Sequence, residues 1–296
     1  MNRSSERRVL CFLNLTGLVL AVALVSGCGA ARAGRFEAFA AVGMKYTQAR
    51  NEFLRHSLDV NIERDTLELR KQHGALDAAG RARVLTEQDK IVQERIAILA
   101  DLERHGAVMS QYFVALARLA SPQADANAAA AAARLSGELG GLTDALAKKS
   151  IAGNPISVLL GKATGMAVGG FRNRALERHL KTHASTVQRE LALEEELLRV
   201  LTEEMIADRK TLQVNERRTV LVPPFRADAP PPEWDAERKR FLLAEVDLTR
   251  ARAAQDAARH LRMVFESLAG GAEDGGLAAL QMAIDQVNQF LRPGGK

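Results

Sequence analysis

Two runs of small residues, AAAAARLSGELGGLTDA at 129–145 and GKATGMAVG at 161–169, decide our interpretation of the fold. Small side chains recur every fourth residue in both runs, and residues at that spacing share one face of a helix. The series are Ala129, Ala133, Gly137, Gly141 and Ala145, then Gly161, Gly165 and Gly169. Because a glycine inside a helix costs about 1 kcal/mol relative to alanine, this spacing indicates close helix packing. With the breaker Gly153-Asn154-Pro155 between them, the runs predict a hairpin over residues 121–172.

The second half of this hairpin also has features of a membrane helix. Between Ile151 and Phe171 the only charged residue is Lys162. Small residues four apart in an apolar segment are typical of packed membrane helices. The breaker leaves an uninterrupted run shorter than the roughly 20 residues that a span needs. We therefore expect soluble helix packing through Gly161, Gly165 and Gly169, with membrane or pore insertion as the alternative.

The N-terminus has the organisation of a secretory signal. A basic opening, residues 1–8, precedes the apolar run Val9 to Leu24, and this order is typical of exported proteins. The run ends in Val25-Ser26-Gly27-Cys28, which resembles the lipobox of bacterial lipoproteins. The resemblance covers only these first residues. It implies cleavage between Gly27 and Cys28, a diacylglycerol thioether on Cys28 and an acyl chain such as palmitate on the new amino group.

This resemblance also implies a cellular location. The residue after the lipidated cysteine is Gly29, whereas aspartate at that position retains many enteric lipoproteins at the inner membrane. We therefore expect an outer-membrane lipoprotein that faces the periplasm, with residues 1–27 as signal peptide and residues 28–34 as tether. Several acyl chains anchor a protein stably, whereas a single chain is marginal. An uncleaved transmembrane anchor is the alternative, because the apolar run is close to spanning length.

Apolar residues at intervals of seven predict long helices in the rest of the chain. Helices are expected over residues 35–73, 81–120, 156–215, 235–269 and 277–291, with the second antiparallel to the first because their loop is short. Two series have no interruption: Phe39, Tyr46, Phe53, Val60 and Leu67, and then Ala184, Leu191, Leu198, Met205 and Leu212. Alanine and leucine dominate, and aromatic residues make up only 4%. The pattern predicts an all-α, elongated antiparallel bundle of five or six helices.

Several local features refine this prediction. Ser121-Pro122 is expected to cap the first helix of the hairpin, and Glu194-Glu195-Glu196 to lie on an outward face. Residues 219–234 hold five prolines, which favour an extended linker, with a docking peptide as the alternative. Trp234 is expected to pin this linker to the bundle, and Asp235 to cap the following helix. The domains are therefore a long-helix bundle at 35–218, the linker at 219–234 and a C-terminal helical pair at 235–296.

Composition and motifs argue against several functions. The net charge is +5, and acidic and basic residues are interleaved, so a nucleic-acid surface is not indicated. His179 and His183 share a helix face, but the glutamate of a zinc-protease motif is missing after His179. Gly161-Lys162 lacks the other residues of a phosphate loop. We therefore expect no metal, no cofactor, no small-molecule substrate and no enzymatic activity.

These observations lead to one functional hypothesis and one alternative. The hypothesis is a non-enzymatic, lipid-anchored helical scaffold of the bacterial envelope, which acts as an adaptor, accessory or inhibitor through a protein partner or self-association. The alternative is a membrane-perturbing protein that uses the apolar arm at 151–171. In outline, long helices around an apolar hairpin resemble the α-helical pore-forming toxins.

Overall fold

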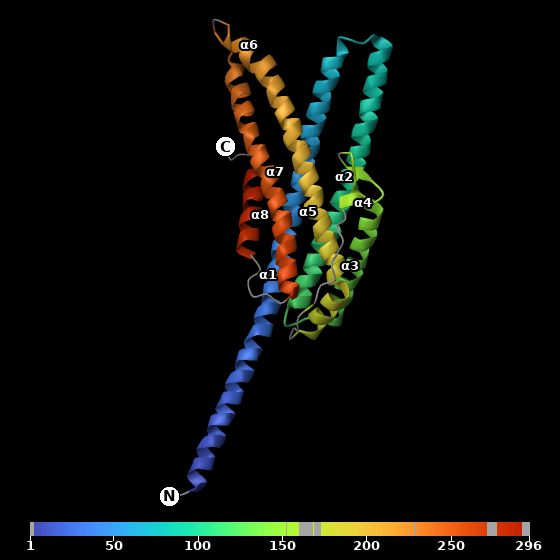
Figure 1. Cartoon of the computed structure of the whole chain (residues 1–296). Helices are drawn as coiled ribbons and strands as arrows, with labels where there is room; N and C mark the ends of the chain where they lie inside the picture. Colours follow the sequence, from blue (N-terminus) through green and yellow to red (C-terminus); the bar gives the residue numbers. More distant parts are fainter. Residues whose placement is uncertain are drawn as a thin grey trace.

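The computed structural model describes the backbone of residues 3–151, 153–159, 168, 173–227, 229–270 and 277–291, and within these ranges the side chains from residue 33 onward except at 245, 247 and 289–291. The fold is all-α and elongated, as the heptads predicted (Figure 1). Its helices are α1 (Arg3–His73), α2 (Ala78–Ala120), α3 (Ala126–Leu146), α4 (Ile156–Leu159), α5 (Arg174–Glu216), α6 (Val222–Phe225), α7 (Glu233–Gly270) and α8 (Leu277–Leu291). The predicted tether at 28–34 is part of α1.

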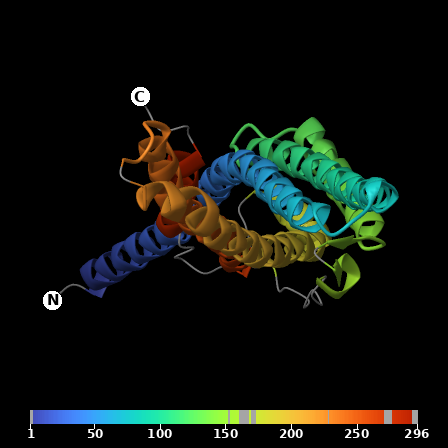
Figure 2. The ribbon, with the colours of Figure 1, turned by 90° about the horizontal axis from the view of Figure 1, so that it is seen from above.

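Helices α1 and α5 form the centre of the bundle. Figure 2 shows α2 and α3 on one side of this central pair and α7 and α8 on the other, in agreement with the packing of α2 on α1, α3 on α5, α7 on α5 and α8 on α1. Helices that follow one another closely in the chain are antiparallel. In contrast, α5 runs parallel to both α1 and α3, because the segment between α3 and α5 returns the chain to the end where α3 began (Figure 1).

The heptad series account for the hairpin of α1 and α2. Phe39, Tyr46, Phe53 and Val60 are buried on α1, and Leu67 packs partly buried against the same core. Gly43 allows α2 to come close, because a Cβ at this position would lie 2.7 Å from the Phe113 ring. The Asp77 side chain caps α2 by accepting a hydrogen bond from Gly80 N at 2.7 Å.

The other side of the bundle is rich in buried alanine. Helix α7 faces α1 and α5 with small buried residues: Ala251, Ala253, Ala254, Ala257, Ala258 and Ala269. Larger side chains of α7 are buried with them: Leu248, Leu261, Val264, Phe265 and Leu268. The Phe265 ring centroid lies 6.4 Å from that of Phe36 and 5.9 Å from that of Phe39. Helix α8 then covers α7 and α1 with Leu280, Ile284 and Val287, as its spacing predicted.

Two predicted helix boundaries are wrong. Ser121 ends α2 instead of starting α3, and Asp125 caps α3 by accepting a hydrogen bond from Ala128 N at 2.7 Å. Aspartate here satisfies a free N–H of the first turn, as serine was expected to do. The predicted unbroken helix over 156–215 is also wrong, because α4 ends at Leu159 and α5 begins at Arg174. The Asn173 side chain caps α5 by accepting bonds from Ala175 N and Leu176 N.

The small-residue hairpin is confirmed at its turn but not in its packing. The chain reverses through the two-residue strands β1 (Ser150–Ile151) and β2 (Asn154–Pro155), with Gly153 at a φ of 77° that favours glycine. Gly137 and Gly141, predicted to face a neighbouring helix, are exposed, and no described atom lies within 4 Å of a Cβ built on either. Helix α3 instead packs through Ala132, Leu135 and Leu139. The second stripe, Gly161, Gly165 and Gly169, lies outside the described residues.

The proline-rich segment is more helical than predicted. Helix α5 continues into a π-helical turn, η1 (Arg217–Leu221), and then into α6. Pro223 and Pro224 have no N–H, so the regular i to i−4 ladder cannot continue there, and Val222 N instead donates to Arg217 O five residues back. Trp234 was expected to pin this segment to the bundle, but its Nε1 donates to Leu221 O of the same segment, at 3.0 Å. Helix α7 begins at Glu233, so Asp235 lies in its first turn.

Candidate functional site

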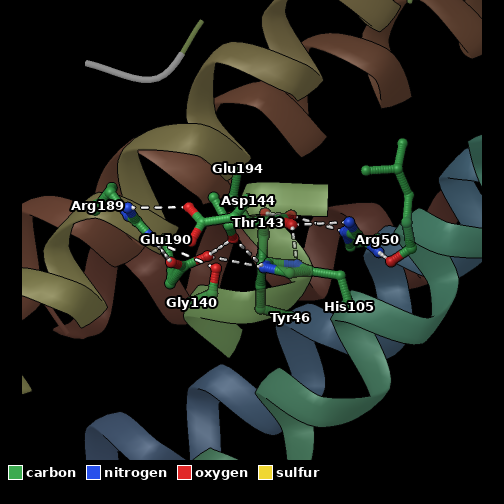
Figure 3. A network of polar contacts seen from close by, with 10 residues as sticks. Tyr46, Arg50, His105, Gly140, Thr143, Asp144, Arg189, Glu190 and Glu194 are labelled. Carbon is green, nitrogen blue, oxygen red and sulfur yellow. Dashed lines mark hydrogen bonds and ion pairs between the residues drawn. The ribbon is translucent and has the colours of Figure 1, made fainter. Parts of the chain in front are cut away.

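A cluster of charged side chains is buried where α1, α2, α3 and α5 meet (Figure 3). The charged cluster, as we define it, consists of Tyr46, Arg50, His105, Thr143, Glu190 and Glu194. At its centre the Arg50 guanidinium donates two hydrogen bonds to the Glu194 carboxylate, both at 2.7 Å. The side chains of Arg50 and Glu194 are 2% and 1% exposed. Such a two-bond pairing fixes both distance and orientation, so it locks α1 against α5.

Arg50 and Glu194 make further hydrogen bonds with their neighbours. The Tyr46 hydroxyl donates to Glu194 Oε2 at 3.1 Å. The remaining Arg50 nitrogen, Nη1, donates to Leu102 O at 2.7 Å and to Asn51 Oδ1 at 3.0 Å. Arg50 therefore also fixes α2, through a backbone carbonyl that lies in the middle of that helix.

His105 joins the two glutamates of α5. Its Nδ1 lies 3.2 Å from Glu194 Oε1, and its Nε2 lies 3.0 Å from Glu190 Oε2. The Thr143 hydroxyl on α3 donates to the same Glu190 oxygen. One chain of polar contacts thus crosses four helices, from α1 through α5 and α2 to α3.

The outer end of this chain of contacts reaches the surface. Arg189 Nη2 lies 3.5 Å from Glu190 Oε1 and 3.4 Å from Gly140 O, while its Nη1 pairs with Asp144 at 3.4 Å. These residues border an open groove of about 560 Å³ between α3 and α5, and its lining includes Gly137 and Gly141. The exposed half of the predicted small-residue stripe therefore lines this groove.

The charges of the cluster stabilise one another. Burial raises the pKa of Glu194, but Arg50 and His105 outweigh this effect and lower it to about 2. Burial lowers the pKa of His105, but its contacts with Glu190 and Glu194 outweigh that and raise it. Burial, with the Glu194 charge, raises the pKa of Tyr46 well above its usual value. The site therefore holds Glu194 as a carboxylate beside Arg50 and keeps the Tyr46 hydroxyl neutral.

Gly106 makes room for this arrangement. A Cβ at Gly106 would lie 2.6 Å from Arg50 Nη1 and 2.9 Å from Asn51 Oδ1. Ordinary contacts between such atoms are longer, so any side chain here would displace the guanidinium. Position 106 therefore favours glycine because the Arg50 guanidinium lies so close to its backbone.

Next to the cluster, the predicted histidine pair takes a structural role. The His179 and His183 rings contact each other at a tilt of 31°, with centroids 4.8 Å apart, and Tyr112 Oη lies 3.2 Å from His179 Nε2. Burial, together with the charge on His183, lowers the pKa of His179 to about 4. In the part of the chain that is described, no group of three histidine, cysteine or acidic residues could hold a metal ion.

The order of polar groups in the cluster resembles a nucleophile, a base and an orienting acid. Thr143 Oγ1 lies 3.3 Å from His105 Nε2, and Glu194 lies on the other ring nitrogen. However, Thr143 donates its hydroxyl proton to Glu190, and the Thr143 and His105 side chains are fully buried. The contacts of these two side chains join α2, α3 and α5.

The residues predicted for lipidation are placed only in part. Gly27 and Cys28 belong to α1, and nothing is described of the Cys28 side chain. No helix is apolar over a span's length in the part of the chain whose side chains are described. Lipidation of Cys28 stays a prediction from the sequence.

The charged cluster itself was missed, although the sequence holds a signal for it. Glu194 was placed on an outward face, which is wrong, because it is buried. It lies three residues after Leu191 and four before Leu198, on the apolar face of α5. Arg50 likewise lies four residues after Tyr46. A charge on the core-facing side of each of two long heptad series indicates a buried pair.

Comparisons of the chain with known protein families, with curated proteins and with solved structures found no match. Function therefore has to be inferred from the residues of this chain. The two features available for that purpose are the lipobox-like N-terminus and the surfaces that the bundle presents.

Proposed function

We propose that the protein is a non-enzymatic, lipid-anchored scaffold that faces the periplasm from the outer membrane of a bacterium. Val25-Ser26-Gly27-Cys28 supports the anchor, because a short apolar run that ends in these residues is a specific pattern at a chain's N-terminus. The closed charged cluster supports a role without catalysis, because its side chains hold helices together and are shielded from solutes.

The observation that carries the scaffold role is the pair of helical arms at the end opposite the N-terminus (Figure 1). The first arm consists of residues 62–98 of α1 and α2, and the second of residues 213–243 of α5, η1, α6 and α7. No described residue within 81–98 or 213–243 is buried. Large apolar side chains are nevertheless exposed there: Leu85, Ile91, Val214, Phe225 and Leu242. The two arms thus present apolar side chains to solvent on segments that have no buried residues of their own, which supports an interaction role.

Both arms are firmly joined to the bundle, which suits a protein that presents them to a partner. Asp208 of α5 accepts hydrogen bonds from Asn61 at 3.0 Å and from Arg64 at 3.1 Å. Arg95 of α2 pairs with Glu204 of α5, with Nη1 at 2.6 Å. These contacts lie between the charged cluster and the arm ends, so the arms are fixed at their base.

The anchor is tested by metabolic labelling with an alkyne palmitate in a bacterial host. The wild-type chain should incorporate the label and lose its signal peptide, and Cys28→Ser should do neither. Cys11→Ser is the matched control, since it removes the only other cysteine and should leave labelling unchanged. Equal labelling of the Cys28→Ser variant, or none of the wild type, would contradict the proposal.

The scaffold role is tested by a photo-crosslinking amino acid placed on each arm, at Ile91 and at Leu242, in intact cells. Discrete crosslinked species from both arm sites are expected, and the exposed position Gly141 on α3 serves as the comparison. Crosslinks from Gly141 alone would contradict the proposed use of the arms. Substrate turnover that is abolished by Thr143→Ala would instead establish an enzyme.

A further inference from the structure

The turn at the end of the first arm has an apex of small and apolar residues. Residues 74–80 read GALDAAG, and they follow α1 and include the start of α2. Ala75, Ala78 and Ala79 are exposed, and Leu76 is half-buried. The apex therefore presents short apolar side chains to solvent at the end of the molecule opposite the N-terminus (Figure 1).

Asp77 is the one charged residue of this apex, and its carboxylate is already engaged. Its Oδ1 accepts a hydrogen bond from Gly80 N at 2.7 Å, and this contact caps α2. A carboxylate at a helix N-terminus is stabilised by the free N–H groups and by the helix dipole. Arg81 is held against the same turn, because its Nε donates to Asp77 O at 3.3 Å and its Nη1 lies 3.1 Å from His73 Nε2. These contacts fix the shape of the turn and use its only carboxylate.

Four cationic side chains flank the apex on its two helices. Arg70 and Lys71 lie in the last turn of α1, and Arg81 and Arg83 lie near the start of α2. All four are exposed. At a rise of 1.5 Å per residue, each lies within about 8 Å of the apex along its helix. Residues 70–83, which we call the cationic turn, therefore hold four cations and Asp77 as the only acid.

Nearby carboxylates neutralise the cationic turn only in part. Glu68 pairs with Lys71 at 2.8 Å. In the part of the chain that is described, no ion pair is found for Arg70 or Arg83. Glu87, the next acidic residue of α2, is about 14 Å from the start of that helix. The positive charge next to the apex is thus left largely unpaired.

The end of the second arm lacks this excess of positive charge. Residues 214–235 hold three arginines, Arg217, Arg218 and Arg226, against four acidic residues. Both arms end opposite the N-terminus (Figure 1), so the second arm is a comparison for the first within the same molecule.

We propose that the cationic turn binds the surface of an anionic lipid bilayer. Lysine and arginine near such a surface are attracted by its negative potential. Short apolar side chains such as Leu76 then enter the boundary between headgroups and acyl chains, while the longer cationic side chains stay at the phosphates. The apex has to pass the phosphates to reach the acyl chains, so an apolar apex flanked by cations fits a bilayer better than an acidic protein surface.

The location of the cationic turn indicates which bilayer it contacts. From Cys28 to the end of α1 at His73 the helix is on the order of 70 Å long. If Cys28 is anchored as proposed above, the cationic turn contacts a second bilayer, and the protein bridges two membranes. The bridging rests on the proposed anchor, whereas the binding of the turn to lipid does not.

Vesicle recruitment with the full chain tests this proposal. The protein is reconstituted through its apolar N-terminus into phosphatidylcholine vesicles, and fluorescent vesicles with about 30% phosphatidylglycerol are added as the probe. Co-flotation of the two vesicle types is measured. Recruitment of the anionic vesicles is expected, together with its loss at high salt, whereas vesicles of phosphatidylcholine alone should not be recruited.

The variant Arg70→Gln/Arg83→Gln should reduce recruitment by roughly tenfold or more, because each cation near the surface adds to binding. The matched control is Arg218→Gln/Arg226→Gln on the second arm, which removes the same charge at exposed positions and should recruit as the wild type does. Leu76→Ser should also reduce recruitment, without any change in charge. Circular dichroism of each variant verifies that the bundle is intact.

The outcomes that overturn the proposal are distinct from failure of the anchor. Reconstitution into the first vesicles reports the N-terminus, and recruitment of the second vesicles reports the cationic turn. Equal recruitment by wild type and Arg70→Gln/Arg83→Gln would refute the proposal, as would an equal loss in the second-arm control. Binding to soluble polyglutamate without recruitment of vesicles would show that the turn binds polyanions instead of a bilayer.

Discussion

The two sides of the bundle share α1 and α5 but are held together by different forces. The charged half, formed by α1, α2, α3 and α5, buries the charged cluster, in which each side chain has a specific partner. The alanine half, formed by α1, α5, α7 and α8, buries alanines of α7 together with larger apolar side chains such as Leu261, Phe265 and Ile284. Apolar contacts tolerate small shifts, whereas a guanidinium with two bonds to one carboxylate does not. The charged half therefore fixes the alignment of the helices, and the alanine half adds apolar burial.

The largest expected effect comes from removal of one partner of the central ion pair. Arg50→Ala leaves Glu194 charged and buried without its guanidinium, so unfolding should become easier by about 3–5 kcal/mol. Arg50→Met/Glu194→Gln should recover much of this loss, because no unpaired charge remains. Urea denaturation followed by circular dichroism measures both variants.

Phe265→Ala in the alanine half is the matched comparison for Arg50→Ala. It should cost about 3–5 kcal/mol through the cavity that it leaves. No double substitution of the charged cluster should recover this loss. Recovery by Arg50→Met/Glu194→Gln in the Phe265→Ala background would contradict the distinction between the two halves.

A smaller effect is expected where helix α2 approaches Arg50. Gly106→Ala places a methyl group 2.6 Å from Arg50 Nη1, so it should destabilise the protein by up to about 3 kcal/mol despite the better helix propensity of alanine. In the Arg50→Met background the same substitution should be close to neutral. A double-mutant cycle from urea midpoints measures the difference, and simple additivity would contradict the proposed contact.

The charged half should also respond to pH. The lowered pKa of His179, about 4, means that its contribution to stability is complete above its unfolded pKa of 6.5 and is lost as the pH falls toward 4. Between pH 6.5 and 4.5 this amounts to about 2 kcal/mol. His179→Gln should flatten that part of the stability profile, and His73→Gln, at an exposed site, should not.

His105 acts in the opposite direction. Because its pKa is raised, its contribution is complete below pH 6.5 and is lost as the pH rises through the raised value. His105→Gln should therefore remove a decline in stability on the alkaline side. Chemical denaturation at a series of pH values measures both slopes, and a profile that His105→Gln leaves unchanged would contradict this assignment.

The smallest effect concerns the exposed stripe on α3. Gly137→Ala and Gly141→Ala should each stabilise the protein by about 0.5–1 kcal/mol, because both glycines are helical and no described atom would touch the added methyl groups. Thermal unfolding measures this gain. A loss of stability would indicate that a second helix does pack on the stripe.

The sequence predicted the helices well and the faces of α3 poorly. Phe39, Tyr46, Leu191 and Leu198 are buried because a seven-residue apolar series leaves one face for the core. Small residues do not show which face of a helix is buried, because alanine and glycine occur both at close helix contacts and on exposed surfaces. Gly137 and Gly141 were therefore expected to be covered but are exposed, whereas Ala129 of the same stripe packs against the core.

The candidate site could be predicted only in part. That Arg50 and Glu194 lie on core-facing sides can be recognised from their heptads, but nothing in the spacing shows that the two positions face each other. Their pairing depends on the parallel alignment of α1 with α5, which the chain reaches through the segment between α3 and α5. Residues more than a hundred positions apart in the sequence come to lie side by side only when the helices pack.

The distance in sequence between Arg50 and Glu194 has a consequence for folding. Arg50 and Glu194 are 144 residues apart in the chain, with α2 and α3 between them. The hairpin of α1 and α2 has a short loop and can form before α5 packs on it, and until then the Arg50 guanidinium lacks its carboxylate and stays hydrated. Closure of so large a loop is slow relative to hairpin formation. A late step of folding is then the loss of water from around the Arg50 guanidinium.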